Sequence, residues 1–431
     1  MKEEGLRKSS AWMVSGQLIA IVFQAIYFVL MGRTLGSQEY GAFVGVVALV
    51  TILTQFSSLG MEMVLVRNIS RDRHSFAATW GNALRISLAG ALLLLLISMA
   101  FGHFVLRPDL RMLIPWIVLS DAVLGKLVVL AGRAFQGAGQ LRHTAQLTTS
   151  TNAGRAALAA ILYFYAHHWH VHPGAYTWAR IYWLSPLVVS SVSTWMVTRR
   201  LGWPRLQRLK LKDLSEGFSF SLSSSSISIY NDIDKTYLVS LGQTYAAGIY
   251  SAAYRVIDVA TAPLIGLYAA AMPRLFREGH KSVEHARTLS GRLMLRTVPY
   301  GIAAAMALYA CAGLFPRVFG HSFAGSVAVV RWLCLLPLIR VLHYAWGSTI
   351  TASASPWNRT VTQLGAAAFN LLLNALLIPR WSWQGAAIAS LLTDGSLAIM
   401  SRLMLWRLQH RQKQTLTASG VTFKQQTRQN I

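Results

Sequence analysis

The segment ALLLLLISMA, at positions 91–100, lies within a longer apolar stretch from 80 to 104 and decides the class of fold. A helix needs about 20 apolar residues to cross a bilayer, and this stretch is long enough. The whole chain agrees, because 54% of its 431 residues are hydrophobic and only 13% are charged. The net charge of +25 would suit a nucleic-acid-binding protein, but these apolar runs exclude a soluble one. They also leave no room for a soluble catalytic domain.

Eleven further segments have comparable length and hydropathy. Because the segments are long and continuously apolar, we expect helices rather than the strands of a membrane barrel. The predicted spans are 12–32, 40–60, 80–104, 112–131, 147–166, 176–197, 217–240, 245–270, 292–312, 324–348, 358–379 and 385–406. The predicted fold class is therefore an all-α integral membrane protein with about twelve transmembrane helices.

Basic residues collect in alternate loops, and this asymmetry predicts the orientation. The segments expected on the inner side hold Lys2, Arg7, Lys8, Arg67, Arg71, Arg73, Arg133, Arg142, Arg199, Arg200, Arg205, Arg208, Lys210, Lys212, Arg274, Arg277, Lys281, Arg287, Arg292, Arg359, Arg402, Arg407, Arg411, Lys413, Lys424 and Arg428. The outer segments hold only Arg33, Arg107, Arg111, Arg317 and Arg380. Since cytoplasmic loops carry the excess of Lys and Arg, both termini are predicted to be cytoplasmic.

The longest basic loop falls at the middle of the chain and predicts two six-helix, pseudo-symmetric lobes around a central cavity. We expect an N-terminal lobe at 1–200, a basic cytoplasmic linker at 201–216, a C-terminal lobe at 217–408 and a polar, basic cytoplasmic tail at 409–431. A weak internal repeat supports the division: Leu35, Gly36, Gly41 and Phe43 recur as Leu241, Gly242, Gly248 and Tyr250. Such symmetry is typical of transporters.

Three motifs resemble a known family. They are the hairpin Gly32-Arg33-Thr34-Leu35-Gly36-Ser37-Gln38-Glu39-Tyr40-Gly41-Ala42-Phe43; Asp234-Lys235 followed by Leu241-Gly242 and Gly248-Ile249-Tyr250-Ser251-Ala252-Ala253-Tyr254; and Asn370, Asn374, Ile378-Pro379 with Trp383-Gln384-Gly385-Ala386-Ala387. Together they resemble the polysaccharide-transporter branch of the multidrug/oligosaccharidyl-lipid/polysaccharide (MOP) superfamily. The resemblance runs in order along essentially the whole chain.

This resemblance implies an O-antigen or exopolysaccharide flippase of the bacterial inner membrane. Its substrate would be an undecaprenyl-diphosphate-linked oligosaccharide, moved from the cytoplasmic to the periplasmic leaflet by alternating access between two lobes. The implied partners are this lipid-linked glycan, membrane lipids and other polysaccharide-assembly membrane proteins, with no nucleic acid among them. The expected function is transport without enzymatic activity.

Several cations lie inside the predicted spans, where exposure to lipid is costly. Arg85, Arg180, Arg296 and Arg331 are close enough to helix ends to reach the headgroups. The candidate substrate-binding residues are Arg155, Arg255, Arg340, Lys126 and Lys235. For the three arginines, the alternatives are a shared aqueous cavity or buried ion pairs. In a cavity, guanidinium groups would match the oxygens of a diphosphate.

Acidic residues in the spans have two interpretations. Asp121, Asp234, Asp258 and Asp394 are candidates for ion coupling, but each is equally able to balance an arginine. Spacing puts Arg255 and Asp258 on one helix face, whereas the adjacent Asp234 and Lys235 are not expected to pair. The polar seventh span would either bind glycan hydroxyls or allow close helix packing. Its polar residues are Ser219, Ser221, Ser223, Ser224, Ser225, Ser226, Ser228, Tyr230 and Asn231.

No cofactor or metal is expected. Cys311 and Cys334 lie in apolar segments, and the histidines at 167, 168, 170 and 172 lack an acid or Cys to complete a site. Two alternative functions remain. A multidrug and toxin extrusion exporter carries mostly cationic substrates, which a net-basic cavity would repel. A polysaccharide polymerase or ligase would need a larger outer loop than the one near His167, and no nucleophile-base pair is recognisable.

Overall fold

The computed structural model describes the backbone of residues 3–353 and 356–418, which is almost entirely helical and contains no strand. Contacts divide the chain into two compact units. Unit 1 comprises Met1–Ala252, Leu314–Val327 and Ile378–Trp383, and unit 2 comprises Ala253–Gly313, Ala328–Leu377 and Gln384–Ile431. Unit 1 thus continues past the predicted linker, through the seventh span and into the eighth. The predicted lobe boundary at 201–216 stays a prediction.

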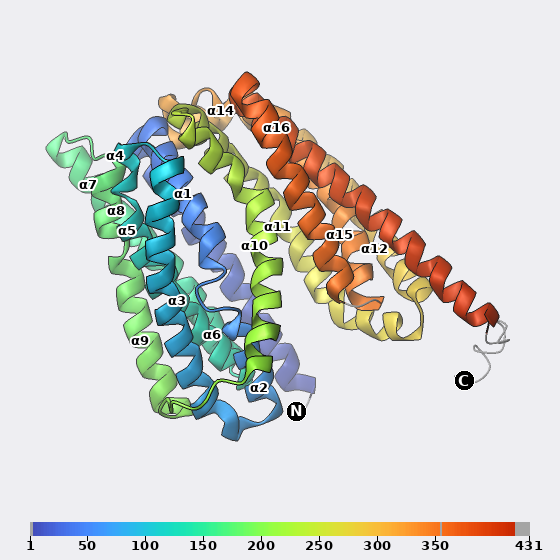
Figure 1. The fold of residues 1–431 in the computed structure, drawn as a ribbon. Helices are drawn as coiled ribbons and strands as arrows, with labels where there is room; N and C mark the ends of the chain where they lie inside the picture. Colours follow the sequence, from blue (N-terminus) through green and yellow to red (C-terminus); the bar gives the residue numbers. More distant parts are fainter. Residues whose placement is uncertain (1–2, 354–355, 419–431) are drawn as a thin grey trace. The chain divides into compact units, whose positions relative to one another are not determined.

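Unit 1 is a helical bundle (Figure 1, blue to green). Its main helices are α1 (Glu3–Thr54), α2 (Met61–Arg71), α3 (Phe76–Val105), α4 (Pro108–Arg111), α5 (Ile114–Ile117), α6 (Lys126–Gly137), α7 (Leu141–Trp169), α8 (Ala175–Tyr182), α9 (Leu184–Leu201) and α10 (Leu211–Ser240). Helix α1 packs against both α7 and α10, and α2 packs against α6. The core between α2, α3 and α6 buries large apolar side chains such as Leu65, Trp80 and Phe135.

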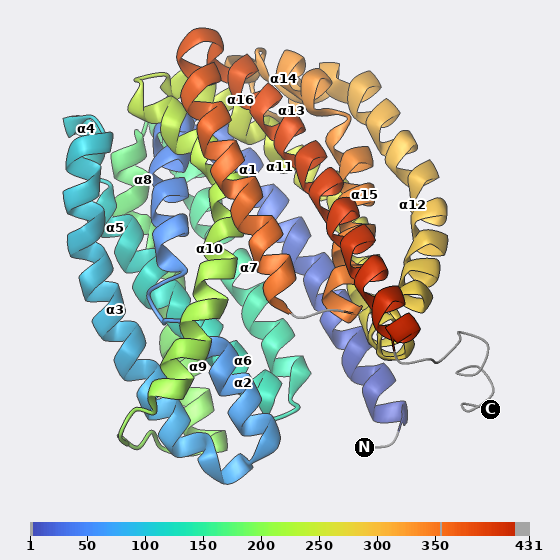
Figure 2. The same ribbon diagram turned by 45° about the vertical axis from the view of Figure 1, so that its right-hand side comes forward.

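Unit 2 contains most of the remaining helices (Figure 2, yellow to red). They are α11 (Thr244–Lys281), which begins in unit 1, α12 (Val283–Cys311), α14 (Ser326–Leu333), α15 (Leu336–Ser353) and α16 (Pro356–Ala418). The short α13 (Phe315–Phe319) belongs to unit 1. Helices α12 and α15 pack side by side, and Ser290 donates a hydrogen bond across them to the Ala345 carbonyl at 2.6 Å.

The twelve predicted spans are all helical, although their boundaries differ. Two continuous helices each contain two spans: α1 bends at Gly36, and α16 bends at Ser382. Two spans are broken instead, at Trp183 between α8 and α9 and at the residues between α14 and α15. Both breaks precede a proline, Pro186 and Pro337, because proline removes a backbone donor and clashes with the preceding turn. Helix α16 also continues to Ala418, into the predicted tail.

Seven helical segments of the described chain are long and apolar enough to cross a membrane. Two of them, Ser15–Thr54 and Trp357–His410, each hold two predicted spans. The three predicted spans outside this set correspond to α7, α8 with α9, and α10, which carry many polar side chains. A polar helix within a membrane bundle needs protein or water rather than lipid around its polar face.

The loops of unit 1 gather at opposite ends as the charge asymmetry predicts. At one end, Arg73 donates to the Ala138 carbonyl, and the Arg205 amide donates to the Ala77 carbonyl at 2.8 Å. At the other end, Arg33 donates to the carbonyls of Arg317 and Val318 at 2.7 and 2.8 Å. The alternation of loops expected from the sequence is therefore present in unit 1. The first group lies at the end predicted to be inner.

The internal repeat has a structural counterpart. Gly36 and Gly242 both adopt left-handed backbone conformations, with φ of 72° and 76°. This region is unfavourable for residues with a Cβ, so the repeated glycines mark equivalent turns. The second pair, Gly41 and Gly248, lies where two backbones meet. The repeat predicted from four matched positions is supported by this geometry.

Candidate functional site

A polar cavity of about 550 Å³ lies within unit 1, between α1, α6, α7 and the π-helix Val118–Gly125. Arg155 and Asp121, two of the predicted site residues, both line it. The other polar lining residues are Gln17, Thr51, Thr54, Gln55, Arg133, Thr144, Thr148, Thr151 and Asn152. Hydroxyl and amide side chains in such numbers are unusual within apolar helices, and the volume is that of a small-molecule site.

Helical spacing places this polar lining. Thr144, Thr148, Thr151 and Asn152 follow one another at intervals of a single turn or less and precede Arg155 on the same face of α7. At 1.5 Å per residue, the stripe extends about 16 Å along the helix from Thr144 to Arg155. It runs from the predicted inner end of unit 1 toward the middle of the span.

Arg155 and Asp121 form an ion pair at the deep end of this cavity. The Arg155 Nη2 atom lies 2.7 Å from Asp121 Oδ1, and the side chains are 22% and 17% exposed. Tyr182 donates from its hydroxyl to Asp121 at 3.3 Å, and the guanidinium carbon of Arg155 lies 4.7 Å from the Tyr182 ring centroid. Arg155 is thus ion-paired and also lines a cavity, whereas Arg255 and Arg340 are not among the residues that line it.

The guanidinium of Arg155 retains donors for a ligand. Its Nε atom is buried and has no hydrogen-bond partner among the described residues. A guanidinium has five N–H donors, and leaving a buried donor unpaired is costly. Asp121 sits in the π-helix, a distortion of α-helices that is frequent at functional sites. The pair thus offers guanidinium N–H donors and a carboxylate acceptor to a ligand in the cavity.

Lys126 and Lys235 are both held by carboxylates inside unit 1. Lys126 lies 3.0 Å from Glu62, which also accepts a short hydrogen bond from Ser58. Lys235 is 2% exposed and lies 2.7 Å from Asp232. This burial favours a structural role for both lysines over contact with a substrate.

The contacts of Asp234 differ from the expectation. Its carboxylate accepts from the Tyr250 hydroxyl at 2.6 Å, and its Oδ1 lies 3.9 Å from the Lys235 ammonium. The sequence argument against this pair was wrong, because the long lysine side chain folds back along α10. The interaction ties α10 to the first turns of α11, so Asp234 is a candidate for ion coupling only if this network opens.

Unit 2 contains a second arginine cluster. Arg340 donates to Asp394 and to Asp258, both at 3.2 Å, and to the Tyr254 hydroxyl at 2.9 Å. Arg340 and Asp394 are each 7% exposed, whereas Asp258 is 41% exposed. Because Arg340 is buried and fully engaged, the ion-pair alternative holds for it. The cluster joins α11, α15 and α16.

Arg255 has the partner that its spacing predicts. Its guanidinium lies 3.6 Å from Asp258, three residues later in α11. Asp258 thus lies between two arginines, and its exposure makes it the accessible acid of this cluster.

Asn370 and Asn374 of the third motif form a separate network: Asn374 donates to Asn370 at 2.8 Å, and Asn370 donates to Thr393 at 3.0 Å. That network connects the two parts of α16 on either side of its bend at Ser382.

The serine-rich span favours packing over glycan contact. Ser221, Ser225 and Ser226 are almost completely buried, and Ser225 donates to the Ile52 carbonyl of α1 at 3.4 Å. Small side chains allow α1 and α10 to approach closely. Arg85, predicted to reach the headgroups, donates to the Gln207 carbonyl of the loop before α10. The four histidines and two cysteines belong to no metal cluster among the described residues.

Sequence reasoning missed several members of these clusters. Glu62 falls outside the predicted spans, and the tyrosines that bond the aspartates come from other helices. The polar stripe of α7 was visible as periodicity, because its polar residues recur every three or four positions. Asp121 and Arg155 are 34 residues apart in the sequence, and Arg340 and Asp394 are 54 apart. No helical periodicity links residues so far apart, so these pairs could not be predicted.

Residues 6–278 match the sequence profile of a family described as polysaccharide biosynthesis protein. The chain belongs to this polysaccharide biosynthesis protein family. The matched range covers more than half of the chain and includes the whole polar cavity. None of the curated proteins compared with the chain matches it significantly in sequence.

Solved structures confirm the fold expected for this family member. An inward-facing multidrug resistance MATE family transporter of the MOP superfamily has a TM-score of 0.72 at 15% identity, covering 91% of this chain and 96% of that one. An outward-facing MATE family transporter of the same superfamily has a TM-score of 0.62 at 15% identity, with coverages of 94% and 96%. The chain therefore has the twelve-helix MOP fold and is a multi-pass membrane protein. This fold is shared with the MATE family transporters named above.

Proposed function

We propose that this protein is a flippase for a polyprenyl-diphosphate-linked oligosaccharide, such as an O-antigen or exopolysaccharide repeat unit. It would move the undecaprenyl-linked glycan from the cytoplasmic to the periplasmic leaflet of a bacterial inner membrane, with both termini cytoplasmic. The observation that carries the proposal is the cavity of unit 1, where a stripe of hydroxyl and amide side chains leads to Arg155. Membership of the polysaccharide biosynthesis protein family supports it.

The lining suits such a substrate in two ways. Sugar hydroxyls both donate and accept hydrogen bonds, and Thr, Asn and Gln side chains do the same. A phosphate is recognised best by guanidinium donors, and Arg155 keeps a buried Nε without a partner. Asp121 would release part of the guanidinium when the phosphate arrives, so the ion pair would hold Arg155 in place between transport cycles.

A second candidate function is export of cationic compounds. Asp121 provides a carboxylate in the same cavity and pairs with Arg155, which leaves Arg133 as the one cation of the lining in excess. The objection that a net-basic cavity repels cations is therefore weaker than the sequence suggested. Two solved structures that share the fold are multidrug resistance MATE family transporters.

Deletion of the gene in its native host tests both functions. The flippase predicts accumulation of the lipid-linked repeat unit in the inner leaflet and loss of surface polysaccharide. Normal surface glycan with increased sensitivity to a cationic dye such as ethidium would reject the flippase and support the exporter. A Thr148→Val/Thr151→Val variant, which removes two cavity hydroxyls at almost constant volume, should restore surface glycan poorly. A Thr198→Val variant on α9, outside the cavity, serves as the expression-matched control.

A further inference from the structure

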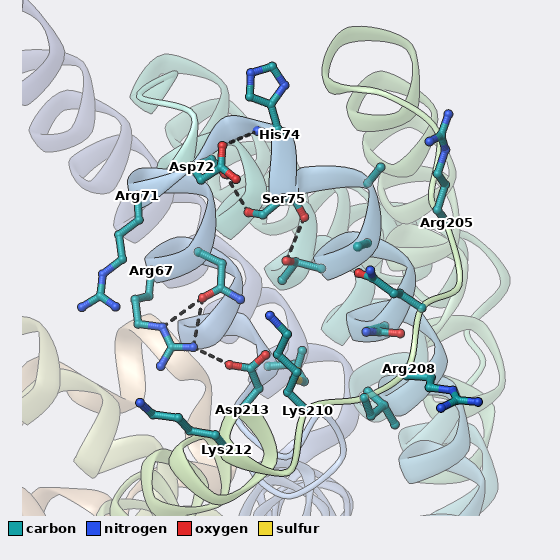
Figure 3. Close-up of a pocket in the computed structure, with 18 of the residues that line it drawn as sticks. Arg67, Arg71, Asp72, His74, Ser75, Arg205, Arg208, Lys210, Lys212 and Asp213 are labelled. Carbon is teal, nitrogen blue, oxygen red and sulfur yellow. Dashed lines mark hydrogen bonds and ion pairs between the residues drawn. The ribbon is translucent and has the colours of Figure 1, made fainter.

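A second pocket of unit 1, with a volume of about 770 Å³, opens at the predicted inner end. One wall is the turn between α2 and α3, and the opposite wall is the segment 202–210 between α9 and α10, here named the basic segment (Figure 3). The cationic lining residues are Arg67, Arg71, Arg205, Arg208, Lys210 and Lys212. The acidic ones are Asp72, Asp213 and Glu216, so cations exceed acids in the lining.

The acids leave most of these cations unpaired. Asp213 and Glu216 both pair with Arg67, the former at 2.5 Å. Asp72 accepts from the His74 amide at 2.9 Å and caps the turn before α3. Among the described residues, no carboxylate pairs with the five other cations of the lining. In the view of Figure 3 the Lys210 ammonium extends toward the middle of the lining residues, and the guanidinium groups of Arg205 and Arg208 point outward from it.

The pocket is held in shape by the backbone. The Arg205 amide donates to the Ala77 carbonyl at 2.8 Å, and a Cβ on Gly81 would collide with the Arg205 backbone. Arg85 donates to the Gln207 carbonyl at 3.4 Å. The basic segment, expected to be only a linker between lobes, is thus fixed along the start of α3. A set of cations held around one pocket by a fixed backbone differs from a diffuse surface charge, because an anion that enters the pocket has several N–H donors within reach of their side chains.

Exposed apolar side chains alternate with the cations of this region. Trp203, Leu206 and Leu211 are 78%, 74% and 83% exposed. Large apolar side chains beside Lys and Arg are typical of surfaces that lie at a membrane interface, where the apolar groups enter the acyl boundary and the cations contact headgroups. A soluble phosphate would need only the cations. The apolar residues therefore favour a lipid.

We propose that this pocket binds the headgroup phosphate of an anionic membrane lipid. Arg71, Arg205, Arg208 and Lys210 contact the phosphate, and Trp203 and Leu211 contact the adjacent acyl region. The site is separate from the polar cavity around Arg155, and it does not depend on which substrate the protein transports. Binding would fasten the basic segment to the turn between α2 and α3.

The test titrates the purified full chain in detergent with phosphatidylglycerol or phosphatidylcholine and counts bound lipid by native mass spectrometry. The site predicts a preference for phosphatidylglycerol. An Arg205→Gln/Lys210→Gln variant should bind it about tenfold more weakly, because two charge-assisted contacts are lost. An Arg274→Gln/Arg277→Gln variant removes the same charge from exposed positions of α11 and should bind as the unaltered protein does. Equal losses in the two variants would show diffuse attraction and overturn the proposal.

A competition experiment separates the lipid from a soluble anion and does not depend on any variant folding. Inorganic phosphate at millimolar concentration should leave phosphatidylglycerol bound, because the acyl region adds contacts that phosphate lacks. Complete displacement, or absence of any preference between the two lipids, would refute the lipid assignment. A Trp203→Ser/Leu211→Ser variant should weaken phosphatidylglycerol binding while all pocket cations remain. Unchanged binding in this variant would contradict the assigned acyl contact.

Discussion

Gly41 and Gly248 lie with their backbones in direct contact where the first turns of α11 cross α1. A Cβ on Gly41 would lie 2.5 Å from the Gly248 nitrogen, and one on Gly248 would overlap the Ser37 carbonyl oxygen. These two glycines correspond in the internal repeat, so each half of the repeat supplies the small residue that the other requires. Close approach of helices at small residues stabilises membrane bundles, where the hydrophobic effect between helices is absent.

A Gly248→Ala variant should therefore be destabilised. The added methyl group has no space between two backbones, and overpacking of this kind costs about 1–3 kcal/mol. Thermal unfolding of the purified protein in detergent would measure the loss. Gly266→Ala in the same helix is the matched control, because a Cβ there meets nothing within 4 Å. The control should be as stable as the original chain or slightly more so. Equal stability of the two variants would refute the close contact.

Substitutions at the Arg155–Asp121 pair should affect stability and transport differently. Asp121→Asn leaves the guanidinium without its charged partner and should cost about 1–3 kcal/mol, reduced by the partial exposure of both side chains. The double variant Asp121→Asn/Arg155→Gln should recover much of that stability, since neither charge remains. Its transport of lipid-linked glycan should still be lost. Normal transport by a well-expressed double variant would remove Arg155 from the substrate site.

The two aspartates that bind Arg340 should respond differently to neutralisation. Asp394→Asn should destabilise the protein by about 2–4 kcal/mol, because a buried charge loses a buried partner. Asp258→Asn should cost about 1 kcal/mol or less, because Asp258 is substantially exposed and solvent screens its interaction with Arg340. Unfolding midpoints of the two variants, measured in one detergent, provide the comparison. The reverse order would contradict the geometry of the cluster.

Asp258→Asn also tests ion coupling. Asp258 is the most exposed acid of the arginine cluster in unit 2, so among the acids of that cluster it is the one we expect to exchange a proton or sodium ion. Transport into vesicles should be slower in this variant and should depend less on an imposed ion gradient. The Arg255→Gln variant, which removes its neighbour but keeps the carboxylate, is the control and should retain the gradient dependence. Unchanged gradient dependence in Asp258→Asn would exclude this residue as the coupling site.

Substitutions in the serine-rich span test packing against glycan binding. Ser225→Leu should be destabilising by about 1–3 kcal/mol, because the side chain is buried between α10 and α1. Ser219→Leu, an exposed serine of the same helix, should have little effect on stability. Ser225→Ala should preserve transport, since the packing contact needs only a small side chain. Loss of transport in a stable Ser225→Ala protein would favour glycan contact instead.

Hydropathy and charge determined the helical class, the positions of the spans and the alternation of the loops. These properties follow from local composition, because each span must satisfy its backbone internally and each loop carries its own charge. The equivalence of Gly36 and Gly242 was also visible, since a left-handed turn needs the same residue in both copies. The spacing of Arg255 and Asp258 was sufficient to predict their contact, because they share one helix.

Only the tertiary structure decided which of the buried charges are balanced and which side chains share a cavity. Glu62 reaches Lys126, and Asp394 reaches Arg340, because packing brings distant positions together and no periodicity within one helix records those pairings. The basic segment is the clearest case. Its cations were evident in the sequence, but their arrangement as a pocket required the segment to fold back on α3. The net charge follows from the sequence alone, whereas binding of an anion depends on where the folded chain places the cationic side chains.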